Sequence, residues 1–145
     1  KGKKHISSTV GHGLMIDHSF SNDRLDQACK NLINLKKALI QGSFEAFANI
    51  VELEALTLHA MMMTSNPYYL LIKPNTLNII NEIWNYRKNT NSEVCFTLDA
   101  GANIHLLYPK NNFTNIQKFI SETLSKFCQN GEFINDHVGN GPNKL

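Results

Sequence analysis

Apolar residues recur every three or four positions in four stretches of the chain, which is the spacing of one face of a helix. This spacing predicts helices over residues 22–41, 44–64, 76–87 and 114–127. The first has one apolar face, formed by Leu25, Cys29, Leu32, Leu35 and Leu39. Asn22 or Asp23 is its expected N-cap and Gly42 its expected end, and Ser43 is the expected N-cap of the second helix.

Two shorter stretches alternate between apolar and polar residues, which is typical of strands. They cover residues 94–98 and 104–108, and residues 99–103 form the expected bend between them. Further strands are predicted at residues 6–10 and at the beginning of 132–145. This order of elements predicts an α+β fold in which the helices pack on one face of a small antiparallel sheet.

Composition narrows the class of protein. The chain has 145 residues, of which 42% are hydrophobic and 18% are charged, and this suits one globular domain. A formal net charge of +2 gives no argument for nucleic acid or an anionic membrane as a partner. No apolar run reaches the roughly 18 residues of a membrane span. Three cysteines without a Cys-x-x-Cys motif suggest reduced thiols in the cytoplasm, and the first residue, Lys1, suggests a piece of a longer chain.

Asp99 is the first candidate for chemistry, because it is a charged residue that directly follows a strand of apolar character. Gly101 comes two positions later, so Asp-Ala-Gly has two interpretations. It is either a turn in which the carboxylate bonds to nearby amides, or a carboxylate at the rim of a sheet that accepts a proton or orients a hydroxyl. Since no second acid is near in sequence, a paired-carboxylate mechanism is not indicated.

Ser7, Ser8 and Thr9 are the second candidate, because hydroxyl side chains shortly before Gly11 suit an anion, although they also suit a plain loop. The spacing is not that of a P-loop. None of the six histidines forms a metal-binding motif, and His59 is expected to be a hydrogen-bonded residue on a buried helix face.

Four segments occur in the order that they take in diphosphomevalonate decarboxylases: KKHISSTVGHGLMI, LTLHAMMMTSNPYYLLI, CFTLDAGANIHLLYP and VGNGP. Over residues 3–142 the chain resembles the C-terminal half of these enzymes, which belong to the GHMP kinase superfamily. The resemblance implies a ferredoxin-like GHMP kinase C-terminal fold. It also implies that residues 1–145 are a single C-terminal domain, and that the N-terminal nucleotide-binding domain is absent from this chain.

The resemblance further implies ATP-dependent conversion of mevalonate 5-diphosphate to isopentenyl diphosphate, with loss of CO₂, in the mevalonate pathway of the cytoplasm. Asp99 matches the catalytic aspartate of the family. Ser8 and Thr9, with Ser7 beside them, match positions that hold the diphosphate of the substrate. ATP and Mg²⁺ are expected to bind mainly to the N-terminal half, and no metal ligands are expected in this one. A small-molecule substrate is the expected partner, without nucleic acid or membrane, and a homodimer remains open.

Some residues depart from the family pattern. Ala102 stands where the family often has proline, and His12-Gly13-Leu14 stands where a methionine usually follows the glycine. Three alternatives therefore stay open: a related GHMP small-molecule kinase, a decarboxylase of a monophosphate substrate, and a non-catalytic α+β binding module. The residues that precede Lys1 in the parent protein would distinguish them, and the 145-residue chain alone is expected to be inactive.

Overall fold

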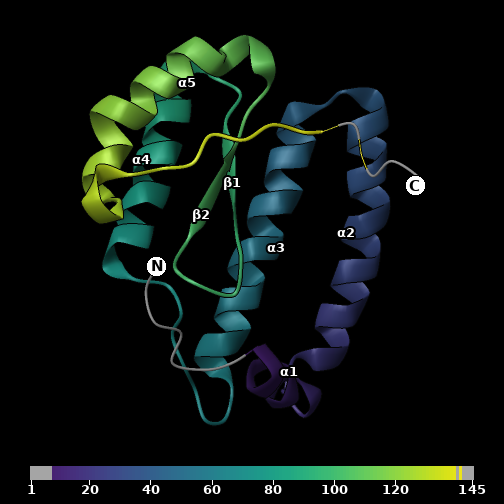
Figure 1. Cartoon of the computed structure of the whole chain (residues 1–145). Coiled ribbons are helices and arrows are strands. Elements are labelled where there is room, and N and C mark those ends of the chain that lie inside the picture. The colour runs from purple at the N-terminus through teal and green to yellow at the C-terminus, as the bar shows by residue number, and fades with distance from the viewer. Residues whose placement is uncertain (1–7, 140, 142–145) are drawn as a thin grey trace, which may run out of the picture.

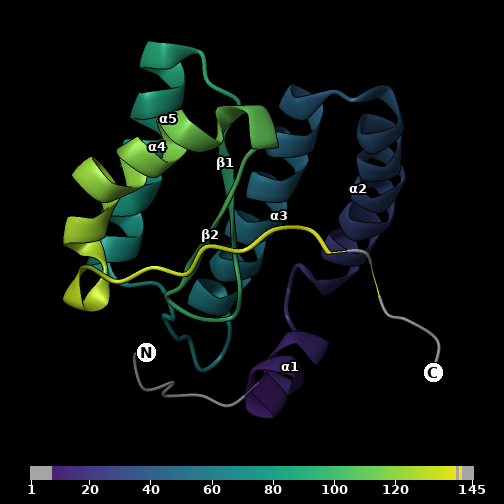
Figure 2. The ribbon, with the colours of Figure 1, turned by 45° about the horizontal axis from the view of Figure 1, so that its top comes forward.

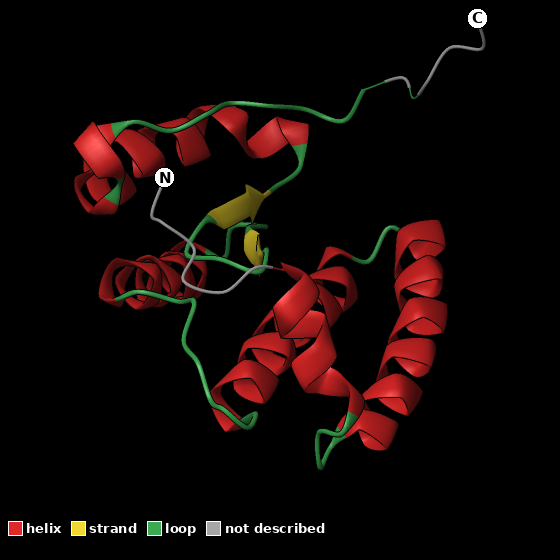
Figure 3. Ribbon diagram, turned by 60° about the horizontal axis from the view of Figure 1, so that its bottom comes forward, coloured by secondary structure: helices red, strands yellow, loops and turns green. Residues whose placement is uncertain are grey.

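Helices make up most of the molecule and surround one β-hairpin (Figures 1 and 3). The computed structural model describes residues 8–139 and 141, with the backbone only at Ser8 and His12. The helices are α1 (Ser8–Ile16), α2 (Ser21–Gln41), α3 (Phe44–Thr64), α4 (Pro74–Thr90) and α5 (Phe113–Phe119), and the strands are β1 (Cys95–Leu98) and β2 (Ile104–Leu107). In the described part of the chain, no helix has the length and apolar character that crossing a bilayer requires.

The connection between α2 and α3 confirms the signals in the sequence. Gly42 ends α2 in the left-handed conformation at φ 65°, which glycine adopts without steric cost. The Ser43 hydroxyl then accepts a hydrogen bond from the Ala46 N–H and caps α3. The expected cap of α2 is wrong: α2 already begins at Ser21, so Asn22 and Asp23 lie inside its first turn.

The apolar face of α2 points away from the core, which the sequence did not predict. Leu25, Leu32 and Leu39 are 66%, 55% and 62% exposed, and Cys29 is exposed too. The helix packs mainly on α3 through its other side, where Arg24 pairs with Glu54. Since α3 is the main neighbour of α2 in the described part of the chain, only a narrow stripe of α2 is covered.

The hairpin supplies the centre of the core. β1 and β2 pair antiparallel, from Cys95 opposite Leu107 to Leu98 opposite Ile104. The alternate residues Val94, Phe96 and Leu98 are buried against α4, α5 and the middle of α3. These contacts confirm the predicted α+β fold with helices on a small antiparallel sheet. The core consists of Ala55, Ile80, Ile83, Val94, Phe96, Leu98, Ile116, Phe119, Ile120 and Leu124.

The predicted strand at residues 6–10 is wrong where it can be compared. Residues 6 and 7 lie outside the described part, and residues 8–10 begin α1. Tertiary packing overrides the β-propensity here, because buried Gly11 lies directly against Tyr69. A β-carbon at Gly11 would come within 3.0 Å of the Tyr69 hydroxyl.

The C-terminal part also differs from expectation. Residues 132–139 are extended but pair with no strand among the described residues, and Ile134 and Val138 remain exposed. An isolated extended segment has no ladder to complete, so it does not become a strand. α4 is longer than the predicted 76–87, with Pro74 in its first turn. The predicted helix 114–127 becomes α5, a π-helical turn over Ile120–Leu124 and a 3₁₀ turn over Ser125–Phe127.

Candidate functional site

The bend between β1 and β2 carries Asp99, the residue after Leu98, the last residue of β1. Figures 1 and 2 show this bend at the same end of the molecule as α1. Leu98 and Gly101 are buried, whereas Asp99 is exposed. The Asp99 carboxylate has neither a hydrogen bond nor an ion pair with any residue that the structure describes. The carboxylate is therefore accessible to solvent, while the chain on either side of it is buried at Leu98 and Gly101.

Side chains from two helices hold the backbone of this bend. His59 of α3 donates a hydrogen bond from Nε2 to the Asp99 carbonyl oxygen at 3.0 Å. Thr76 of α4 donates from Oγ1 to the Ala102 carbonyl oxygen at 2.9 Å. The Gly101 N–H donates to the Asp99 carbonyl oxygen at 2.7 Å. His59 and Thr76 are both only 2% exposed, so the donors of these bonds are buried while their acceptors lie nearer the surface.

His59 forms this contact as an uncharged imidazole. Its burial lowers its pKa below the ordinary 6.5, although the hydrogen bond to the Asp99 carbonyl and the nearby Asp99 charge act in the opposite direction. A carbonyl oxygen only accepts, so the proton of the neutral ring is on Nε2. This confirms the expectation of a hydrogen-bonded residue on a buried helix face and identifies its partner.

A second polar cluster lies at the other end of β1. The Glu52 carboxylate of α3 accepts bonds from Trp84 Nε1 at 3.0 Å, from the two Arg87 guanidinium nitrogens at 2.8 and 3.1 Å, and from the Phe96 N–H at 3.4 Å. Arg87 also donates to the Val94 carbonyl at 3.1 Å. Among the described residues, β1 has a strand on one side only, and these groups satisfy backbone atoms on its other edge.

The serine–threonine segment is described in part. Ser7 lies outside the described residues, Ser8 is the first residue of α1, and Thr9 is exposed. The start of a helix has N–H groups without intrahelical partners. The turn that follows α1 contacts the end of α3, where His18 Nε2 lies 3.1 Å from Thr64 Oγ1. The structure thus places α1 and the Asp99 bend at the same end of the fold (Figure 2).

Sequence reasoning missed the role of Thr76. Its hydroxyl accepts a hydrogen bond from the Lys73 N–H at 3.2 Å, at the start of α4, and donates to the bend. A threonine two positions after Pro74 indicates the beginning of a helix, which is a usable local signal. Its second partner, 26 positions away, left no local signal.

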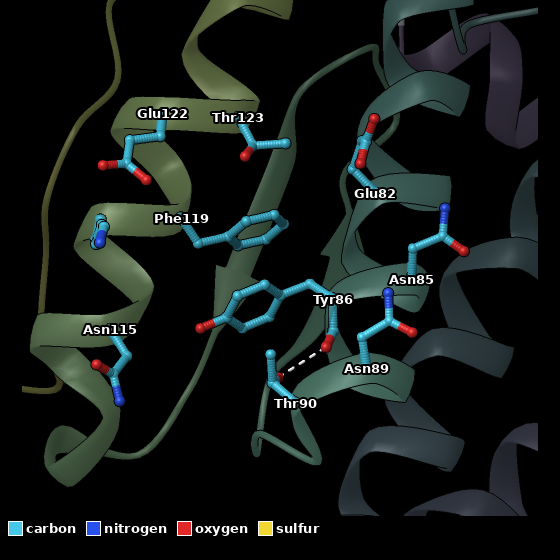
Figure 4. A pocket seen from close by; sticks show the side chains of 10 residues that line it. Glu82, Asn85, Tyr86, Asn89, Thr90, Asn115, Phe119, Glu122 and Thr123 are labelled. Atoms are coloured by element: carbon cyan, nitrogen blue, oxygen red, sulfur yellow. Dashed lines mark hydrogen bonds between the residues drawn. The ribbon is translucent and has the colours of Figure 1, made fainter.

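A separate pocket of about 470 Å³ lies between α4 and the helical segment that begins with α5 (Figure 4). The rings of Tyr86 and Phe119 stack inside it, with centroids 4.0 Å apart. Asn85, Asn89 and Asn115 line it with amide groups. Asp99 and the serine–threonine segment do not contribute to this pocket, so it is separate from the candidate site.

The candidate site can perform proton transfer or orient a hydroxyl, because it presents one unpaired carboxylate. Among the residues that the structure describes, no three His, Cys, Asp or Glu side chains gather as ligands of a metal ion.

Comparison with solved structures gives a consistent set of relatives. A mevalonate diphosphate decarboxylase from Legionella pneumophila is 29% identical, with a TM-score of 0.79 over 85% of this chain and 39% of that one. The mevalonate diphosphate decarboxylase from Enterococcus faecalis is 27% identical, with a TM-score of 0.76 over 83% of this chain and 38% of that one. The structure of MDDEF in complex with MVAPP, AMPPCP and magnesium is 28% identical, with a TM-score of 0.79 over 87% of this chain and 38% of that one.

Among curated proteins, the phosphomevalonate decarboxylase of Haloferax volcanii is 21% identical over 111 residues, which are 77% of this chain and 34% of that protein. The chain therefore spans between a third and two fifths of the length of these relatives. The family model described as the mevalonate 5-diphosphate decarboxylase C-terminal domain matches residues 1–144. The likeness confirms the GHMP-type fold, and the chain belongs to the family of mevalonate 5-diphosphate decarboxylase C-terminal domains.

Proposed function

We propose that this chain is the C-terminal domain of a diphosphomevalonate decarboxylase, and that Asp99 is its catalytic residue. The observation that carries the proposal is an exposed, unpaired carboxylate on a bend whose backbone is bonded to two buried side chains. The full protein would convert mevalonate 5-diphosphate and ATP into isopentenyl diphosphate, ADP, phosphate and CO₂. Membership of the family supports this assignment.

Asp99 would act on the tertiary 3-hydroxyl of the substrate. A tertiary alcohol is a weak nucleophile, so a carboxylate within hydrogen-bond reach would orient it and take its proton while its oxygen attacks the γ-phosphorus of ATP. Phosphate then leaves C3. The bond between C2 and the substrate carboxylate breaks and releases CO₂, and the electron pair of that bond forms the C2–C3 double bond. Once Asp99 has released this proton to solvent, its negative charge would also favour the positive character that develops at C3.

The beginning of the chain would bind the diphosphate of the substrate. Ser8 and Thr9 are the first two residues of α1 and Ser7 precedes them in the sequence, and hydroxyls together with the N–H groups at the start of a helix suit phosphate oxygens. The two segments would then have different roles: the segment at α1 would bind the diphosphate of the substrate, and the bend would present the Asp99 carboxylate.

The remaining parts of the active site would come from an N-terminal nucleotide-binding domain of the same protein. This chain covers only 38% of MDDEF, whose structure contains AMPPCP and magnesium. We therefore assign ATP and Mg²⁺ mainly to that domain, where Mg²⁺ neutralises charge on the transferred phosphoryl group. The protein would act in the cytoplasm on a small-molecule substrate, without nucleic acid or membrane, and a homodimer is compatible with the exposed α2 face.

A second candidate differs in the substrate only. The Haloferax volcanii relative is a phosphomevalonate decarboxylase, so mevalonate 5-phosphate is the competing substrate. Comparison of kcat/KM for the monophosphate and the diphosphate in the full-length protein distinguishes the two. If the protein prefers the monophosphate, the proposed substrate is wrong, whereas the proposed role of Asp99 is unaffected.

Asp99→Asn in the full-length protein is the direct test of the catalytic role. It keeps the shape of the side chain and removes the proton acceptor, so we expect turnover to fall at least about 10²-fold. Release of CO₂ and ADP is the measurement. Glu93→Gln is the matched control, since Glu93 is an exposed acid beyond the other end of β1.

Ser8→Ala completes this test, because it is expected to raise KM more than it lowers kcat. Near-normal turnover of Asp99→Asn would contradict the proposed role, and an unchanged KM of Ser8→Ala would contradict the diphosphate contact.

A further inference from the structure

Five described side chains are polar or charged and yet buried, and two of them bond to the Asp99 bend. They are His59 and Thr76, and the others are His18, Glu52 and Ser65. Burial of a polar group is costly unless it is hydrogen-bonded. His59 and Thr76 each donate a hydrogen bond to a backbone carbonyl of this short bend.

We propose that His59 and Thr76 are positioning residues for Asp99, which they hold in place through the carbonyl groups at residues 99 and 102. This inference rests on the proposed function, because it concerns how the carboxylate assigned there is oriented. Neither side chain is assigned to the substrate. Each acts through the backbone of the bend.

The two bonds fix the bend from two independent elements. His59 reaches it from α3 and Thr76 from α4, and their acceptors stand three residues apart along the chain. The Gly101 N–H closes the bend onto the same Asp99 carbonyl that His59 binds. Two anchors on one short segment restrict both its position and its rotation, so the direction in which the Asp99 side chain leaves the backbone is set before substrate binds.

The carboxylate itself stays free because the anchors act on the main chain. A donor bonded directly to the carboxylate would lower its basicity and compete with the hydroxyl of the substrate. Here the Asp99 carbonyl accepts from His59 and Gly101, while the side chain has no partner among the described residues. Such an arrangement combines a fixed location with an available proton acceptor, as a pre-organised site needs.

Two pairs of variants in the full-length protein test the inference. His59→Leu and Thr76→Val remove the donors at nearly constant volume, whereas His59→Gln and Thr76→Ser keep a donor. Since a small misplacement of a reacting group costs up to about 10²-fold, we expect each donor-free variant to lower kcat by about 10-fold or more while KM changes less than about 2-fold. The donor-keeping variants should recover most of kcat.

Ile116→Val is the control for general destabilisation. Ile116 is fully buried in α5, and loss of one methylene there costs about 1 kcal/mol without touching the bend. We expect kcat to stay within about 2-fold of the parent protein. Each variant is measured well below its unfolding midpoint, so that the rates refer to folded protein.

The same substitutions in an Asp99→Asn background separate this inference from the proposed function. If the two residues act through Asp99, His59→Leu lowers the residual rate of Asp99→Asn less than about 2-fold. Full activity of Asp99→Asn would overturn the proposed function. Two outcomes would overturn the positioning role alone, provided that Asp99→Asn has a low rate. One is an unchanged kcat for both donor-free variants, and the other is an equal loss of rate in the parent and Asp99→Asn backgrounds.

Discussion

Two carboxylates lie at the two ends of β1, and they differ in burial and in hydrogen bonding. Glu52, beside the beginning of the strand, is buried and accepts hydrogen bonds from Trp84, Arg87 and the Phe96 N–H. Asp99, just after the end of the strand, is exposed, and its carboxylate has no partner among the described residues. At this end the backbone carbonyl of Asp99 accepts hydrogen bonds, whereas its side-chain carboxylate accepts none from the described residues.

The difference shows what each end contributes. A buried carboxylate with several donors has no capacity left for a ligand, so Glu52 fastens β1 to α3 and α4. A carboxylate without a partner adds little to stability but is open to substrate. The first end of β1 therefore serves stability, and under the proposed function the second end serves chemistry. Variants that affect the two ends separately test this division.

Cys95 tests how tightly the first end is closed. It is fully buried beside Glu52, and burial, followed by the negative charge of Glu52, raises its pKa to about 12. Only about 10⁻⁴ of such a thiol is thiolate at pH 8. We expect iodoacetamide to label Cys95 at least about 10³-fold more slowly than exposed Cys29, as measured by mass spectrometry of the native protein. If Cys95 and Cys29 were labelled at comparable rates in the native protein, and urea did not speed up labelling of Cys95, this end of the strand would be accessible to solvent.

Glu52→Ala should produce the largest loss of stability at the first end. It leaves the Arg87 guanidinium, Trp84 Nε1 and the Phe96 N–H without their acceptor, and breaking a buried pair in this way costs about 3 kcal/mol. Urea unfolding followed by the fluorescence of Trp84, the single tryptophan of the chain, gives the measurement.

Glu54→Ala is the matched control for this variant. Glu54 also lies in α3 and pairs with an arginine, Arg24 of α2, but its side chain is 31% exposed. We expect it to cost less than about 1 kcal/mol. Asp99→Asn should change the free energy of unfolding by no more than about 0.5 kcal/mol. A loss for Asp99→Asn as large as that for Glu52→Ala would remove the division between the two ends.

The sequence predicts those elements whose signals are local. The span of α3, its Ser43 cap, Gly42 and the hairpin follow from periodicity and turn chemistry. α1 was missed because close packing of Gly11 on Tyr69 is a long-range effect that outweighs β-propensity. The exposure of Leu25, Leu32 and Leu39 was also missed, since an apolar face predicts a contact without showing what covers it.

The candidate site divides in the same manner. Asp99 was identifiable because a charge directly after an apolar strand is a local irregularity. His59 could be expected to be buried and bonded, but its partner is 40 positions away, and no pattern in either segment indicates it. The residue proposed to bear chemistry is thus easier to find in the sequence than the residues proposed to position it.

The second end should also respond weakly to pH through His59. Burial lowers the pKa of His59 below 6.5 in the folded protein, so the unfolded chain binds a proton first as pH falls. Its contribution to the free energy of unfolding is therefore fully present above pH 6.5 and declines as pH falls through the lowered folded pKa. Urea unfolding between pH 7.5 and 5 should show a smaller decline for His59→Gln than for the parent protein, because glutamine keeps a donor but does not titrate. Equal declines in the two proteins would mean that the imidazole at this end is not held neutral, and that the contrast with the charged Glu52 cluster is weaker than the geometry indicates.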